Sequence, residues 1–255
     1  SYNINIHTQL NLKRNNFASN FSKQQQIMWP LFPGSHHLIN IFYGLCCMAI
    51  TDYFYARHTQ GRWLILHTLA NLFITGFSLT DFATTLSDPA KSCSPISAYS
   101  LNPVYGIAAL HLYHLIAFPN LSISDWVHHL LFGVVICTVG IVFVVGPIQN
   151  FIAFFICGLP GALDYAMLFG VKQGYVEKTD EKMWNARINV WVRSPGLMSC
   201  CCFLYVASLY GIEESLCTRN KSIISVIGAL VFLNGQYYMQ VVVGNTFRKV
   251  QRYSS

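Results

Sequence analysis

The chain has 255 residues, of which 53% are hydrophobic and only 10% are charged, and its net charge is +6 at neutral pH. Soluble domains carry about 25% charged residues, so this composition argues against an ordinary water-soluble enzyme and favours a chain that lies in a bilayer. The positive charge suits contact with anionic lipid headgroups. No dense basic stripe with interleaved aromatic residues lies outside the apolar runs, so we expect no nucleic-acid partner.

The apolar runs are continuous rather than alternating, which predicts membrane-spanning helices. We expect an all-α bundle of about seven transmembrane helices. Residues 1–35 are polar and are expected to form a tail, residues 36–247 a single transmembrane domain, and residues 248–255 a short basic tail. The predicted spans are Leu38–Tyr55, Trp63–Thr84, Leu101–Phe118, Trp126–Gly146, Ile148–Gly170, Gly196–Ile212 and Ile223–Val243.

Seven spans place the two ends of the chain on opposite sides of the membrane. More lysines and arginines fall on the side of the C-terminus, which predicts a cytosolic C-terminus. Cys93 and Cys217 are the cysteines that lie in loops, and this topology places both on the N-terminal side. In an oxidising compartment they could form a disulfide.

Histidines and an aspartate interrupt two neighbouring apolar runs. The third span contains "HLYH", with His111 and His114, and the fourth begins with "SDWVHHLLFG", with Asp125, His128 and His129. Ionisable groups inside a bilayer cost several kcal/mol unless they face protein or water, so we expect these to face the interior. Asp125 is predicted to be the helix N-cap and to bind one imidazole. The other imidazole nitrogen would then be a general base.

The fifth span adds further polar and irregular positions. Asp164 follows "GLPGAL", and Lys172 comes eight residues later. Pro160 is predicted to kink this helix. We expect His128, His129, Asp125 and Asp164 to be the catalytic candidates. The residues expected to line a lipid cavity are His111, His114, Pro160 and Lys172.

A metal site is the alternative use for the four histidines His111, His114, His128 and His129. Neither histidine pair is extended by a further histidine, and no tightly spaced set of Cys or His ligands appears. We therefore assign no metal, and a histidine-ligated metal lipid oxidase remains the third of three functional hypotheses.

The order of these motifs resembles the TLC-domain family, which includes ceramide synthases and translocating-chain-associated membrane proteins. The resemblance runs from Leu110 to Leu197, within a TLC-like core at about 63–243. It rests on "SDWVHHLLFG", Asp164, Lys172 and "RSPG" at 193–196. Ceramide synthases share a His-Asp-x-x-Asp motif, whereas this chain has Pro160, Gly161 and Asp164 at those positions.

The resemblance implies a membrane protein that binds or processes a lipid acyl chain in an intramembrane cavity, with acyl-CoA as co-substrate if it is an acyltransferase. It also implies the endoplasmic reticulum; another organelle membrane, such as the mitochondrial inner membrane, is the alternative. Membrane lipids are the expected partners. The second hypothesis is a non-catalytic accessory subunit of a larger membrane complex, in which the histidines serve as interhelical hydrogen-bond partners.

Overall fold

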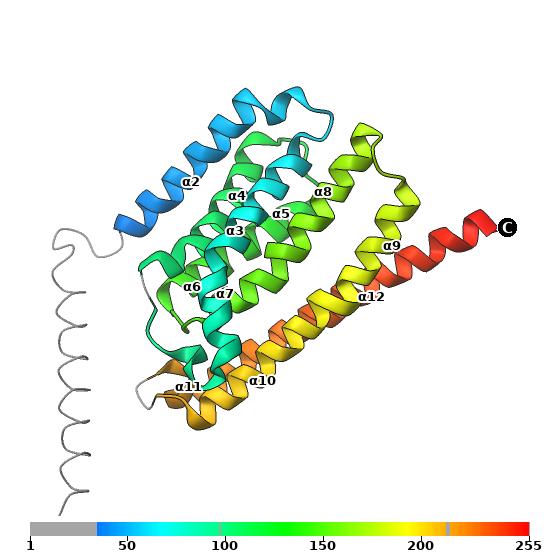
Figure 1. Cartoon of the computed structure of the whole chain (residues 1–255). Helices are drawn as coiled ribbons and strands as arrows, with labels where there is room; N and C mark the ends of the chain where they lie inside the picture. Colours follow the sequence, from blue (N-terminus) through cyan, green and yellow to red (C-terminus); the bar gives the residue numbers. More distant parts are fainter. Residues whose placement is uncertain (1–34, 97, 213–214, 255) are drawn as a thin grey trace, which may run out of the picture. The chain divides into compact units, whose positions relative to one another are not determined.

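The structure is a computed structural model that describes residues 35–96, 98–212 and 215–254. The predicted tail, residues 1–34, lies outside the described residues. The chain divides into two units, Ser1–Ile39 and Asn40–Ser255. Apart from the first residues of α2, Ser35–Ile39, the features that follow lie in the second unit. The described residues contain helices and turns but no strand (Figure 1).

The described part of the first half of the chain contains five α-helices, together with three short 3₁₀ turns and one π-helical segment. These elements are α2 (Ser35–Phe54), η1 (Ala56–His58), α3 (Arg62–Ser87), η2 (Pro89–Cys93), η3 (Ala98–Leu101), α4 (Asn102–Ala117), α5 (Ile123–His128), the π-helical η4 (His129–Ile136) and α6 (Cys137–Val142).

Two long helices of the second half each contain a π-helical turn followed by a proline in the next helical turn. The elements are α7 (Ile148–Ala153), the π-helical η5 (Phe154–Gly158), α8 (Leu159–Gln173), α9 (Lys178–Ile188), the π-helical η6 (Asn189–Arg193), α10 (Ser194–Tyr210), α11 (Leu216–Arg219) and α12 (Lys221–Ser254). Residues predicted to form a short basic tail from 248 instead continue α12 as far as Ser254.

Six helices in the described part of the chain are long and apolar enough to cross a membrane, which is the architecture of an integral membrane protein. They cover His36–His58, Arg62–Ser87, Asp125–Val142, Ile148–Gln173, Lys178–Tyr210 and Lys221–Arg248. The predicted all-helical membrane bundle is confirmed at this level, but the count of about seven is not. The helix α4 has only 16 residues, fewer than the roughly 20 that a bilayer requires.

The sixth predicted span was placed too late in the sequence. We expected Gly196–Ile212, whereas the helix runs without a break from Lys178 to Tyr210. Its charged first turns suggested a loop, but Glu181, Asn185 and Asn189 lie four residues apart and are buried. Residues at this spacing share one face of a helix, so the polar groups point inward together.

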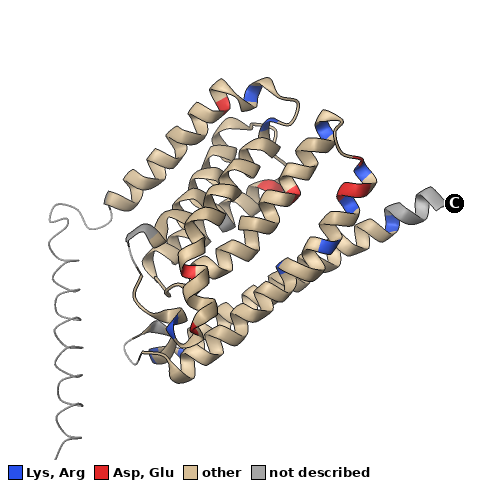
Figure 2. Ribbon diagram, in the orientation of Figure 1, with Lys and Arg blue, Asp and Glu red and all other residues tan. Residues whose placement is uncertain are grey.

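The helix α3 is central in the second unit, where it packs against α8, α4 and α7, while α10 packs against α12 (Figure 1). Aromatic rings fill the α3–α7 contact, with Phe82 stacked on Phe151 at a centroid distance of 5.0 Å. Large apolar side chains such as Leu72 and Leu230 are exposed on the outside. Most of the ribbon between the helix ends carries no charge (Figure 2), as expected for a lipid-facing surface.

The helix α4 runs alongside α3, from the level of Asp81 to the level of Arg62. Just before α4 begins, the Ser100 carbonyl accepts a hydrogen bond of 2.7 Å from Asn150, which also donates to Asp81 near the end of α3. Where α4 ends, the Phe118 ring lies 4.5 Å from the guanidinium of Arg62, the first residue of α3. The two helices are therefore antiparallel, and α4 lies beside the part of α3 between Arg62 and Asp81.

A disulfide between Cys93 in η2 and Cys217 in α11 lies at the end of the bundle where α3 finishes. These are the two loop cysteines for which the sequence suggested a disulfide. Gly146 closes against the same segment: a Cβ there would overlap the backbone of Cys93, and its φ of +132° suits only glycine. The loops after α3, after α6 and after α10 thus meet at one end of the molecule.

Candidate functional site: a histidine cluster

Four histidines from two helical elements form one cluster. His111 and His114 belong to α4, and His128 and His129 lie at the junction of α5 and η4. The ring of His129 lies 4.3 Å from that of His114 and 5.1 Å from that of His111, measured between centroids. His128 lies 5.5 Å from His111 by the same measure. His111 and His128, which are 17 positions apart in the sequence, are thereby brought into contact.

A glycine permits this close approach of the two elements. Gly133 of η4 lies against His111, and a Cβ at position 133 would overlap the Cβ of that histidine. Adjacent residues on an α-helix normally project about 100° apart. The π-helical turn that begins at His129 changes this spacing and is the kind of irregularity often found at functional sites.

Backbone carbonyls fix the tautomer of two imidazoles. The Nδ1 atom of His111 lies 2.8 Å from the carbonyl oxygen of Ile107, and that of His67 lies 2.8 Å from the oxygen of Trp63. A carbonyl oxygen can only accept a hydrogen bond, so each Nδ1 must carry the proton. Each Nε2 atom therefore keeps a free lone pair, which can accept a proton or bind a metal ion.

Two other imidazole nitrogens in the cluster have no hydrogen-bond partner. These are the Nδ1 atoms of His114 and His129, and both are buried. The whole His129 side chain is only 5% exposed. Buried polar atoms in folded proteins nearly always have a partner, so these two nitrogens mark a place where a further group would be stabilised.

The cluster extends to three residues that were not assigned to the predicted site. His67 lies 5.4 Å from His114 and 4.5 Å from Tyr165 between ring centroids, and Trp63 lies 5.2 Å from His67. Trp63 and His67 are four residues apart, so they share one face of α3. This spacing, together with the tyrosine beside Asp164, was the signal in the sequence that could have found them.

The predicted role of Asp125 was wrong in one respect. Ser122, not Asp125, is the N-cap of α5, and Asp125 is the third residue of a capping box. Its carboxylate accepts hydrogen bonds from the backbone N–H and the hydroxyl of Ser122, at 3.2 and 2.7 Å. These bonds satisfy the start of the helix. Asp125 thus positions the histidine pair by holding α5 rather than by bonding an imidazole.

Asp164, the other predicted catalytic carboxylate, lies in a separate polar network. Its Oδ1 atom accepts a hydrogen bond of 2.7 Å from the Asn185 amide of α9. Asn185 in turn accepts from Asn189, which also accepts a hydrogen bond of 2.8 Å from Arg193. The buried carboxylate of Glu181 continues the row and pairs with Lys182 at 3.1 Å. The fifth span therefore contributes Tyr165, and not Asp164, to the histidine cluster.

Pro160 and Lys172, predicted to line a lipid cavity, lie at opposite ends of α8. Pro160 is buried in the first turn of α8, directly after the π-helical turn η5, which is where a kink was predicted. Lys172 is exposed in the last turn. Neither residue contributes to the ring contacts of the histidine cluster described above.

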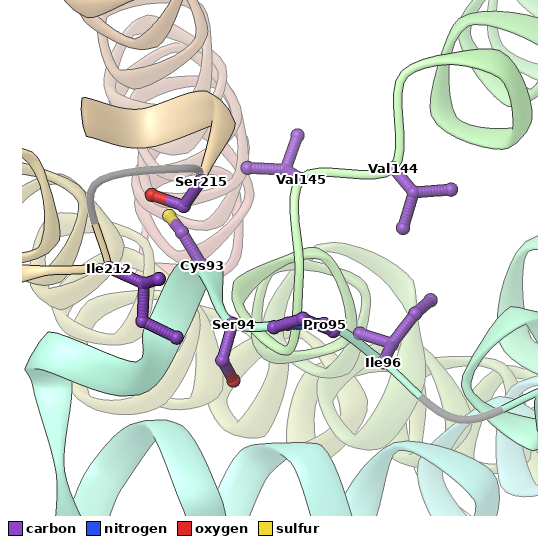
Figure 3. Close-up of a pocket in the computed structure, with 8 residues that line it drawn as sticks. All are labelled: Cys93, Ser94, Pro95, Ile96, Val144, Val145, Ile212 and Ser215. Carbon is purple, nitrogen blue, oxygen red and sulfur yellow. The ribbon is translucent and has the colours of Figure 1, made fainter. Parts of the chain in front are cut away.

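A cavity of about 270 Å³ opens at the disulfide end of the bundle (Figure 3). Cys93 and Val145 lie on its wall. His67 and Ser87 are 20 residues apart on α3, so the cavity lies about 30 Å along the bundle from the histidines. It is therefore a feature of the opposite end of the molecule from the cluster.

Models of known families, curated proteins and solved structures were compared with the chain, and none matches it. What the site can do chemically therefore follows from its own residues. The five imidazoles can transfer protons and bind transition metals, and the Tyr165 hydroxyl beside them can donate or accept a hydrogen bond. They lie in a bundle whose outer surface carries many large apolar side chains.

Proposed function

We propose that the protein is a TLC-type integral membrane protein that processes a lipid acyl chain, with the histidine cluster as its reactive centre. The single observation that carries the proposal is the convergence of "HLYH" on α4 with "HH" at the start of η4. Each stretch alone would serve as a polar patch between helices. Together they place at least one unpartnered, buried imidazole nitrogen, Nδ1 of His129, inside an apolar bundle.

Acyl transfer is the reaction that this arrangement suits. An imidazole of the cluster takes the proton from the hydroxyl or amine of a lipid acceptor. The acceptor oxygen or nitrogen then bonds to the thioester carbonyl of an acyl-CoA, and the carbon–sulfur bond breaks. The departing thiolate takes a proton, which balances the reaction. The carbonyl of Ile107 holds the His111 imidazole in place, which is the positioning role predicted for Asp125.

The membrane topology belongs to the same proposal. We propose that α4 is a seventh crossing, because it runs antiparallel to α3 from the level of Asp81 to that of Arg62. Its 16 residues fall short of a full bilayer, but η3 precedes it directly and adds four residues. The histidines then lie near the side that carries Arg57 and Arg62, which the charge rule assigns to the cytosol, where acyl-CoA is available.

The test is a lipid analysis of cells that express the protein. His128→Ala/His129→Ala should abolish any change in lipid composition that the wild-type protein produces, while His58→Ala, outside the cluster, should retain it. Expression and thermal stability of both variants are compared in detergent. If the wild-type protein and the double variant give the same lipid profile with equal folding, the proposal fails and an accessory role in a membrane complex gains support.

A further inference from the structure

We propose that His111, His128 and His129 form a binding site for one divalent transition metal ion, most suitably Zn²⁺. Each histidine offers one ring nitrogen, and the three nitrogens lie within 4.8 Å of one another. Three ligands around a tetrahedral zinc ion are about 3.3 Å apart, because each Zn–N bond is about 2.0–2.1 Å. Side-chain rotations that shorten the distances between the three ring nitrogens by about 1.5 Å would therefore give tetrahedral zinc geometry.

The bond from His111 to its own helix is of the kind that metal-binding histidines make. Metal-binding histidines almost always donate their second N–H to a carboxylate, a carbonyl or water. In His111 the carbonyl of Ile107 accepts this bond at 2.8 Å, which leaves Nε2 as the ligand atom. The site thus has one imidazole whose orientation and tautomer are set before an ion arrives.

His129 provides the second, independent observation. Its side chain is 5% exposed, and its Nδ1 atom has no hydrogen-bond partner. A buried acceptor or donor left without a partner costs about 1–3 kcal/mol. A metal ion bound by the triad would provide the missing partner of this nitrogen directly, or would fix the ring so that a bound water provides it. The cost of burying this histidine is then offset by the ion.

The donor set selects the class of ion. Three imidazoles suit Zn²⁺, Cu²⁺, Fe²⁺ or Ni²⁺, whereas Mg²⁺ and Ca²⁺ require oxygen ligands. The carboxylate nearest in sequence, that of Asp125, is bonded to Ser122. Three protein ligands also leave the fourth position of a tetrahedral ion for water or substrate, as in catalytic rather than structural zinc sites. His114 lies beside His129, outside the triad.

The site deepens the proposed function and rests on it for the substrate, but not for binding of the ion. An ion at this position would polarise the carbonyl of the acyl donor and stabilise the negative charge that develops on its oxygen. The proton acceptor for the acceptor lipid would then be an imidazole outside the triad. No metal was predicted from the sequence, because neither histidine pair is extended by a further histidine and no tightly spaced Cys or His ligands appear.

The experiment uses the full chain, purified in detergent, stripped with a chelator and reloaded with Zn²⁺ or Co²⁺. We expect one ion per chain by elemental analysis, and Co²⁺ should give the visible absorption bands of a tetrahedral nitrogen-ligated site. His111→Ala, His128→Ala and His129→Ala should each weaken binding by more than the roughly 10–100-fold that the loss of an outer partner costs. His58→Ala is the matched control and should bind normally.

Conservative His→Gln variants at the same positions guard against misfolding, because they keep a polar side chain of similar length. Absence of a bound ion in the wild-type protein after loading, or full binding by the triple His→Gln variant, would overturn the site. The two proposals fail separately. A protein without metal whose lipid profile depends on His128 and His129 retains the proposed function, whereas a protein that binds Zn²⁺ without altering any lipid retains only the metal site.

Discussion

Gly133 of η4 and His111 of α4 lie so close together that no side chain fits between them: a Cβ at position 133 would overlap that of His111. This contact sets the distance between the two elements that carry the histidines. The geometry of the cluster therefore depends on a residue that has no chemistry of its own.

Gly133→Ala is expected to separate the two elements and to disrupt the cluster. Overpacking of this kind costs about 1–3 kcal/mol, and the shift should also reduce the binding of Zn²⁺. Thermal unfolding in detergent and Co²⁺ absorption measure the two effects. Gly76→Ala is the matched control, because nothing lies within 4 Å of a Cβ at that position. Equal metal binding by both variants would show that the contact does not position the histidines.

The helices of bilayer length could be predicted from the sequence, whereas the detailed geometry of the histidine cluster could not. Apolar runs of bilayer length predict helices without knowledge of any contact, and the structure contains them. The histidines on the third and fourth spans were also expected to face the interior; His129 is buried, whereas His111 and His114 are only partly buried. Their partnership was not predictable in detail, because it depends on Gly133 and on the π-helical turn at His129. Neither feature has a periodic signal in the sequence.

The misplaced expectations have a common physical cause. A charged residue near the start of a helix resembles either an N-cap or a loop, and only the backbone tells which. Asp125 was therefore predicted to be the N-cap, although it is the third residue of the helix. Similarly, the charged and amide residues after Lys178 resembled a cytosolic loop, although Glu181 and Asn185 are buried by their packing against other helices. The composition of a segment does not show which of its polar residues are buried by contacts with other helices.

Asp125→Asn distinguishes a capping role from a catalytic one. If the carboxylate only satisfies the helix start through Ser122, then this variant and Ser122→Ala should each cost about 1 kcal/mol of stability. Both variants should bind Zn²⁺ with nearly unchanged affinity. Thermal unfolding and metal titration in detergent provide the comparison. A loss of binding or lipid activity in Asp125→Asn that exceeds the loss in Ser122→Ala would assign the carboxylate a direct role.

Asp52, Arg62 and Tyr113 form a charged network that ties the end of α2 to α3 and α4. The Asp52 side chain is buried and accepts hydrogen bonds of 2.7 Å from the Nε atom of Arg62 and from the Tyr113 hydroxyl. Asp52→Asn removes the charge that accepts the Arg62 hydrogen bonds, and because the Arg62 side chain is partly exposed we expect a loss of about 1.5 kcal/mol. The midpoint of thermal unfolding measures it. Asp88→Asn, which breaks the exposed pair with Lys91, is the control and should have little effect.

The Cys93–Cys217 disulfide closes a loop of 124 residues, which includes both helices of the histidine cluster. Cross-links of long loops stabilise a fold by about 2–4 kcal/mol, mainly by restricting the unfolded chain. We expect Cys93→Ser/Cys217→Ser to lower the unfolding temperature by a corresponding amount. Alkylation before and after reduction should give a mass shift of two extra labels in the wild-type protein. Cys47→Ser, which alters an exposed free cysteine, should leave both measurements unchanged.

The disulfide also constrains the orientation of the chain in the membrane. Its two cysteines meet at the end where α3 finishes and α12 begins, so that end faces an oxidising compartment if the bond persists in cells. With α4 as a seventh crossing, the N-terminus lies on the same side as the disulfide and the C-terminus on the opposite, cytosolic side. Epitope tags at the two ends, probed with protease in sealed vesicles, should therefore show opposite protection. Equal protection of both tags would remove α4 from the set of spans, and the histidine cluster would then lie on a helix that enters the bundle without crossing the membrane.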